Sequence, residues 1–478
     1  MIILPLAAAL IFQTASLEEA VREASTLAEA GSWGEAKDLL QEAGVEQSTE
    51  GAALALYGRC FLRHVEAQIG SGELSGLEVN DAFLDAADWL ERAVKAGGGS
   101  LAAIDWSEAL LNAGDTRMAL GAASDGREKF PQDASLILQW ARVRAVQAQN
   151  FKTMDALEKA SSAWQEAAEA CGEAMEQAPN EAEPCVRRGE NLLWLASVDT
   201  ETNRREEAIA CWTEALSRNR ENVDLGGMVA WLGTDAAPLL AACAKDSPKD
   251  PMLRWFEGMA WYSGAPRDWK KVRSAFEAVL DIEPTFTNAN FFLAQGSFDE
   301  GTRLLANEEE GRSGQAFRYS SAKWAKYLAD FGEAHLADSA LAERIDWLVT
   351  KGTMKDAVGL LEWLTRARPG DAEAWQNLGF FLRDTRKYEE SLAAYKKALE
   401  ITPKDPQILN DAAVILHYYL KRDDEIALAW YEEAAAIAAS QLDSSTLLDK
   451  DARSRVEIAL RDARTNLARL KKGDRRNR

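Results

Sequence analysis

The residue types that most often carry out chemistry are scarce in this chain and lie far apart. Its 478 residues include only three histidines, His64, His335 and His417, and no two of them have metal-ligand spacing. The five cysteines form no CxxC pair, and their odd number does not fit a disulfide framework. A nucleophilic cysteine needs a basic partner close by, and the sequence places no histidine near one. We therefore expect no catalytic residue, no metal site and no cofactor.

Carboxylates, by contrast, are abundant. The chain has 77 Asp and Glu residues against 55 Lys and Arg, a formal net charge of -22. A pair of carboxylates can hydrolyse a glycosidic bond, but the sequence singles out no such pair, and runs such as 308–310 are typical of solvated surface. The negative charge would repel a phosphate backbone, so we expect no nucleic-acid ligand.

The elements that would position any site follow a repeating pattern of helix pairs. The second helix of a pair carries Ser391, Tyr395 and Ala398, and Pro403 follows it. The same slots recur 34 residues earlier, where Ala357 begins the set. Because proline cannot donate the next helical hydrogen bond, it is suited to the end of such a helix. Six of the twelve prolines occupy this slot: Pro131, Pro179, Pro248, Pro284, Pro369 and Pro403.

The first helix of the best pair carries Trp375, Leu378, Gly379 and Leu382. A glycine at this position would let the two helices of a pair cross closely, and it recurs as Gly58, Gly189 and Gly258. Together the two helices resemble the tetratricopeptide repeat family over about residues 16–440. The resemblance implies an all-α, right-handed α-solenoid of stacked helical hairpins with a C-terminal capping helix.

The spacing of the pattern predicts five segments. Residues 17–286 form an N-terminal repeat array and residues 338–440 a C-terminal array. Between them, 287–337 is expected to be a degenerate repeat or hinge, with a loop at 307–314. The last segment, 441–478, is predicted to contain the capping helix and a basic tail.

The first segment, residues 1–16, begins with an apolar run that is too short to span a bilayer. It resembles a secretory signal, although no Lys or Arg precedes the run. The alternative is an apolar helix that packs on the first repeat. We expect an exported, cell-envelope protein if the signal is real and a cytoplasmic protein otherwise.

The family resemblance also implies a concave groove, lined by the first helix of each pair, that binds an extended or helical peptide. The inward positions of three such helices are the candidate groove residues. For Trp255 and Tyr262, packing against the following unit is an equally weighted alternative. The full set is Trp255, Met259, Tyr262, Gln376, Phe380, Arg383, Asn410, His417 and Tyr418.

These observations favour a non-catalytic scaffold or adaptor that binds a protein or peptide partner, and they leave its oligomeric state open. Two alternatives remain. One is a membrane-surface assembly factor of the cell envelope, held by the N-terminal apolar run and the basic tail. The other is an enzyme built as an α/α toroid, similar to a glycoside hydrolase.

Overall fold

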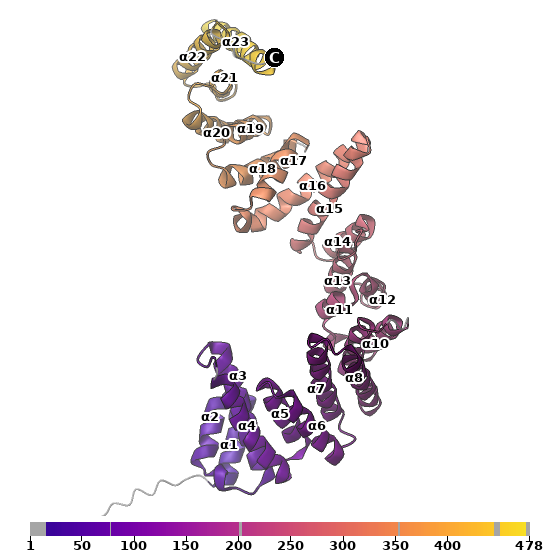
Figure 1. The fold of residues 1–478 in the computed structure, drawn as a ribbon. Coiled ribbons are helices and arrows are strands. Elements are labelled where there is room, and N and C mark those ends of the chain that lie inside the picture. Colours follow the sequence, from indigo (N-terminus) through magenta and orange to yellow (C-terminus); the bar gives the residue numbers. More distant parts are fainter. Residues whose placement is uncertain (1–15, 77, 200–202, 352–353, 444–449, 475–478) are drawn as a thin grey trace, which may run out of the picture. The chain divides into compact units, whose positions relative to one another are not determined.

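A computed structural model describes residues 16–76, 78–199, 203–351, 354–443 and 450–474 of the chain. Every regular element in these ranges is a helix (Figure 1). The predicted all-α fold is therefore confirmed. Residues 1–15 of the predicted export segment lie outside the described residues.

The chain divides into two compact units, 1–239 and 240–478. The helices of the first unit are α1 (Leu17–Glu29), α2 (Trp33–Glu42), α3 (Gly51–Ser71), α4 (Glu78–Lys95), α5 (Gly99–Asn112), α6 (Thr116–Lys129), α7 (Ala134–Thr153), α8 (Leu157–Gln177), α9 (Glu183–Ala196), α10 (Arg204–Asn219) and α11 (Leu225–Leu232). Short 3₁₀ turns lie at Val45–Gln47, Arg220–Asn222 and Gly233–Asp235. The division falls within α12 (Ala236–Asp246).

The second unit contains α13 (Pro251–Tyr262), α14 (Trp269–Ile282), α15 (Asn288–Ala306), α16 (Glu310–Phe331), α17 (Ser339–Lys351), α18 (Met354–Ala367), α19 (Ala372–Asp384), α20 (Tyr388–Ile401), α21 (Pro406–Val414), α22 (Asp424–Asp443) and α23 (Lys450–Lys471). A 3₁₀ turn lies at Gly332–His335, and a π-helical turn at Ile415–Leu420 continues α21.

Within each unit, consecutive helices pack as antiparallel pairs, and each pair packs against the next along the chain. In the first unit the pairs are α1–α2, α3–α4, α5–α6, α7–α8 and α9–α10. In the second unit they are α13–α14, α15–α16, α17–α18, α19–α20 and α21–α22. One pair cannot bury its own apolar face, so the neighbouring pair completes its core.

The prolines end the second helices as predicted. Helices α6, α8, α12, α14, α18 and α20 each end two residues before their proline. In four of these turns an aspartate follows the proline by two residues and caps the next first helix. The Asp371 carboxylate, for example, accepts a hydrogen bond from the backbone N–H of Ala374 at 3.1 Å. Proline and aspartate together therefore set the length of the turn between repeats.

The glycines lie where the helices of a pair cross, also as predicted. The large residue of the second helix lies directly on the glycine of its own pair and also packs against the next pair, as Phe276 does on Phe292. A Cβ added to Gly379 would lie 3.0 Å from the ring of Tyr395, and one added to Gly258 would lie 2.7 Å from that of Phe276. A side chain at either glycine would push the two helices apart.

Residues 287–337, predicted to be a degenerate repeat or hinge, contain a well-formed hairpin. Helices α15 and α16 are 19 and 22 residues long, and only residues 307–309 connect them. The loop predicted at 307–314 is therefore too long. Ser313, within the predicted loop, is buried in α16, and Gly301 on α15 lies against the ring of Phe317 on α16. Whether this hairpin acts as a hinge remains a prediction.

The predicted capping helix is α23. Its buried residues, Ala459, Ala463 and Leu470, face α21 and α22, and its opposite side is exposed. It thus takes the place that the first helix of a further repeat would occupy.

One helical stretch among the described residues, Leu225–Asp246, is long and apolar enough to cross a membrane by length and composition. A 3₁₀ turn interrupts it at Gly233–Asp235, and core helices of folded proteins have the same composition. It is weak evidence for a membrane span.

The glycine contacts lead to a stability prediction for the first unit. A Cβ at Gly189 would lie 2.9 Å from Nε1 of the fully buried Trp212, so Gly189→Ala should lower the free energy of unfolding by about 1–3 kcal/mol. Gly121 is an exposed helical glycine with no atom near its added Cβ. Gly121→Ala should therefore raise the stability of the same unit by about 0.5–1 kcal/mol. Urea unfolding of both variants measures the two shifts, and equal shifts would contradict the crossing contact.

Candidate interaction surfaces

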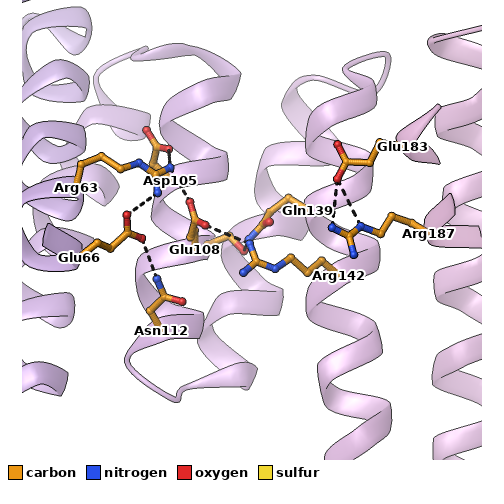
Figure 2. A network of polar contacts seen from close by, with 10 residues as sticks. Arg63, Glu66, Asp105, Glu108, Asn112, Gln139, Arg142, Glu183 and Arg187 are labelled. Atoms are coloured by element: carbon orange, nitrogen blue, oxygen red, sulfur yellow. Dashed lines mark hydrogen bonds and ion pairs between the residues drawn. The ribbon is translucent and has the colours of Figure 1, made fainter. Parts of the chain in front are cut away.

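In the first unit, one face of α3, α5 and α7 carries a connected set of polar side chains (Figure 2). Nε of Arg59 on α3 donates to Asp105 on α5 at 2.7 Å. Glu108, also on α5, accepts from Arg63 of α3 at 2.9 Å and from Arg142 of α7 at 3.1 Å. We call this set the inner-face network; its members are Arg59, Arg63, Glu66, Asp105, Glu108, Asn112 and Arg142.

The network is neutral, because three arginines face three carboxylates. Asp105 is only 2% exposed, and burial raises the pKa of its carboxyl although the guanidiniums of Arg59 and Arg63 oppose that shift. Its partners come from the neighbouring first helix, so the pairing fixes the register of one repeat on the next. This set was not predicted from the sequence. Its residues Arg59, Arg63 and Glu66 nevertheless have the same i, i+4, i+7 spacing as the candidate residues of α19.

A small cavity of about 260 Å³ lies beside this network, between α7, α8 and α9. Trp164 and Trp194, whose rings stack at 5.6 Å, form part of its apolar wall, and Arg142 and Arg187 stand at its edge. Sites for drug-sized ligands start at about 300 Å³, so this cavity fits one large side chain.

In the second unit, the candidate residues of α13 belong to an aromatic cluster. The ring centroid of Trp255 lies 5.0–5.4 Å from those of Phe276, Phe286 and Phe292. Tyr262 lies 4.9 Å from Phe292, and Met259 packs on the same core. All three are half-buried. The structure therefore places them as packing contacts with α14 and α15, the alternative that the sequence left open.

The candidate residues of the last pair are also inaccessible. Asn410, His417 and Tyr418 are 5% exposed or less. Asn466 on α23 donates to Asn410 and accepts from the Tyr418 hydroxyl, both at 3.0 Å. Nε2 of His417 lies 2.9 Å from the backbone oxygen of Asp474. Our expectation that these three line an open groove is corrected: the capping helix covers them.

The candidate residues of α19 remain accessible. Gln376 lines a groove of about 1130 Å³ between α19, the turn before α21, and α23; we call it the α19 groove. Glu373 and Asn377 line the same groove, and Arg455 and Val456 of α23 lie on its far side.

The same face of α19 continues one turn further to Phe380, whose side chain is 41% exposed. The guanidinium of Arg383 lies 4.3 Å from the ring centroid of Phe380 and pairs with Asp384 at 2.8 Å. Of the sequence-predicted residues, Gln376, Phe380 and Arg383 thus form one accessible surface.

A titrating carboxyl lies beneath the capping helix. Burial raises the pKa of Asp411 on α21 to about 6; the amide of Asn410 and the guanidinium of Arg383 oppose the shift, and Asp462 of α23 adds to it. Because the folded-state pKa lies above the ordinary value of about 3.9, the fold favours the protonated acid.

The corresponding stabilisation is present at low pH and is lost as the pH rises through about 6. Asp411→Asn keeps the shape of the protonated acid and cannot ionise. From about pH 5 to pH 7 the thermal midpoint of the second unit should fall more in the native protein than in this variant. Identical pH dependence in the two proteins would contradict the raised pKa of Asp411.

The inner-face network yields a second stability prediction. Asp105→Ala leaves Arg59 and part of Arg63 without their buried acceptor, so it should destabilise the first unit by about 1–3 kcal/mol. Asp125, an exposed residue of α6, is the matched control, and Asp125→Ala should stay within about 0.5 kcal/mol. Chemical unfolding measures both, and a neutral Asp105→Ala would show that the network adds no stability.

Comparison with known proteins finds a family whose model matches part of this chain. Paired helices that stack in chain order define a helical-repeat protein. The family model described as tetratricopeptide repeat matches residues 372–405, which comprise α19, α20 and the turn that follows. Residues 372–405 therefore match one tetratricopeptide repeat, and the chain as a whole is an all-α protein of stacked helical hairpins.

Two curated relatives match a short part of the chain. Photosystem I assembly protein Ycf3 of Sorghum bicolor is 39% identical over 64 residues, and that of Dioscorea elephantipes is 38% identical over 64 residues. Each match covers 12% of this chain and 37% of the relative, so the chain spans about a third of the relatives' length.

Solved structures match more of the chain at low similarity. The C-terminal part of a TPR repeat-containing protein from Cytophaga hutchinsonii is 13% identical, with a TM-score of 0.30, over 64% of this chain and 98% of that one. A chain of the Cut9–Hcn1 complex of the APC/C is 12% identical, with a TM-score of 0.25, over 95% and 97%.

Proposed function

We propose that this protein is a non-catalytic scaffold that binds a partner polypeptide along the accessible face of α19. Tetratricopeptide repeats are in general protein-interaction units, and the family match falls on this helix. The observation that carries the proposal is the α19 groove, which runs beside an exposed aromatic side chain, Phe380.

The chemistry of the groove suits a polypeptide. Glu373, Gln376 and Asn377 offer both hydrogen-bond donors and acceptors to a peptide backbone. Phe380 supplies an apolar anchor, and Arg383 holds its ring in place from one side. An aromatic anchor with a polar surround is the usual form of a binding hot spot.

We extend this proposal to assembly and location. The two curated relatives are named as assembly proteins, and a scaffold that holds another polypeptide during assembly fits the α19 groove. Export to the cell envelope is proposed from the apolar run within residues 1–16. N-terminal sequencing of the native protein tests that proposal: cleavage near residue 16 supports export, and an intact Met1 contradicts it.

The α/α-toroid alternative receives no support from the helix pairing, which runs from each pair to the next within both units. Among the described residues, no group of three or more His, Cys, Asp or Glu side chains could hold a metal ion.

The test of the groove replaces Phe380 with a photo-reactive phenylalanine analogue in the full chain. Crosslinking in cells should join the partner to this position. Ile401 on α20, 37% exposed, is the matched control, and the same analogue there should not capture that partner. With the partner identified, Phe380→Ala should weaken binding by about 2 kcal/mol, or about 30-fold, as measured by calorimetry. Equal capture at both positions, or unchanged affinity, would refute the groove assignment.

A further inference from the structure

The exposed side of α23 is strongly basic. Five cations follow helical spacing along its full length, a sixth lies in the turn directly after it, and all six are exposed: Lys450, Arg453, Arg461, Arg464, Lys471 and, in the turn, Lys472. We call this set the basic outer face. On that side of α23, Glu457 is the one carboxylate that lies among the cations. By helical spacing, Asp451 and Asp462 lie at the margin of the basic outer face. The cations are spread over six turns, so compensation of the helix dipole, which acts on the last turn, does not account for them.

Several of these cations lack a local partner. Arg453 pairs with Glu457 at 3.1 Å, Arg461 with Asp462 at 3.1 Å, and Lys471 with Glu432 at 2.8 Å. Within the described part of the chain, Lys450, Arg464 and Lys472 have no ion-pair partner. The basic outer face therefore presents uncompensated positive charge on a protein whose net charge is -22.

The opposite end of the repeat array is strongly acidic. Residues 16–50, which include α1 and α2, carry nine carboxylates and two cations, a net charge of -7. All nine carboxylates are exposed: Glu18, Glu19, Glu23, Glu29, Glu35, Asp38, Glu42, Glu46 and Glu50. We call this set the acidic first hairpin. Lys37, one of its two cations, already pairs with Asp38 at 2.9 Å.

Both surfaces belong to terminal elements of the array, α1–α2 and α23. A repeat array exposes at each end a surface that a further repeat would cover. Here these surfaces carry opposite charges, so the end of one copy is complementary to the beginning of another. Complementary potentials steer two molecules together and fix their orientation.

Other anionic partners fit less well. An anionic membrane or a nucleic acid would approach a molecule that is acidic as a whole, with a net charge of -22. Peripheral membrane helices also insert apolar side chains, but the apolar side of α23 is buried against α21 and α22, and only Ile458, 45% exposed, lies near the basic side. A second copy also has a net charge of -22, but it gathers nine exposed carboxylates on one hairpin that can lie directly on the basic outer face, and the contact needs no inserted apolar side chain.

We propose that the basic outer face of α23 docks on the acidic first hairpin of a second copy of this chain, which gives head-to-tail self-association. Such a contact uses two different surfaces, so it extends into longer chains or closes into a ring. Exposed ion pairs are individually weak and are screened by salt. The association is therefore reversible and depends steeply on ionic strength. This inference does not rest on the α19 groove.

Sedimentation velocity of the full chain tests the proposal. At an ionic strength of about 0.01 M, where charges act over about 30 Å, the protein should sediment as dimers and larger species that grow with concentration. At about 1 M, where the range falls to about 3 Å, it should be a monomer. A monomer at both ionic strengths would overturn the proposal.

Charge reversals at exposed positions identify the surfaces. The triple variant Lys450→Glu, Arg461→Glu, Arg464→Glu should be monomeric at low salt. The matched control Lys245→Glu, Lys249→Glu, Lys396→Glu changes the net charge equally at exposed positions outside α23 and should still associate. Loss of association in both triple variants would show a net-charge effect and would overturn the assignment to α23.

A charge swap separates a specific contact from misfolding. Glu23→Lys, Glu42→Lys, Glu46→Lys changes the net charge of the acidic first hairpin from -7 to -1, and this variant alone should also be monomeric. Mixed with the α23 triple variant, it supplies an unaltered basic outer face, and the α23 variant supplies an unaltered acidic first hairpin, so the mixture should form heterodimers at low salt. Failure of the mixture, with circular dichroism showing both proteins helical, would contradict the head-to-tail contact. If the native protein stays monomeric and binds anionic vesicles or RNA, that result would also contradict the head-to-tail contact.

Discussion

The contact between a glycine on the first helix of a pair and a large side chain on the second determines much of this structure. At Gly379 and Tyr395 the two helices approach so closely that a Cβ would not fit without a shift. Each pair is then a closely packed hairpin, and its remaining apolar surface must be covered by the next pair. The proline and aspartate in the connecting turn set the distance along the chain between one hairpin and the next. Because these turns are short, the hairpins stack in chain order.

The sequence predicted those features that depend on local chemistry. The helix ends before proline, the helix crossings at glycine and the capping helix were all predicted, because each requires a particular residue type at a fixed spacing. The hairpin of α15 and α16 was misread as partly loop, because glycine and serine also allow long helices to pack closely, as Gly301 and Ser313 do. Composition alone does not distinguish these two uses.

The candidate site was harder to predict than the fold, since exposure depends on neighbours that repeat spacing does not reveal. Trp255 and Tyr262 have groove positions but lie in an aromatic cluster, and His417 is covered by α23. Of the candidate residues, only Phe380 is exposed, and Gln376 on the same helix lines an open groove. The inner-face network of the first unit could have been predicted from the i, i+4, i+7 spacing of its residues on α3. Its charges pair with each other across neighbouring repeats.

The central claim is that the repeats stack so that α19 keeps an open face while α23 covers the face of the last pair. Hydroxyl-radical footprinting of the native full chain measures this directly, because Phe380 and Tyr418 are both aromatic and differ mainly in exposure. We expect rapid oxidation of Phe380 and strong protection of Tyr418. Comparable oxidation of the two residues would contradict it.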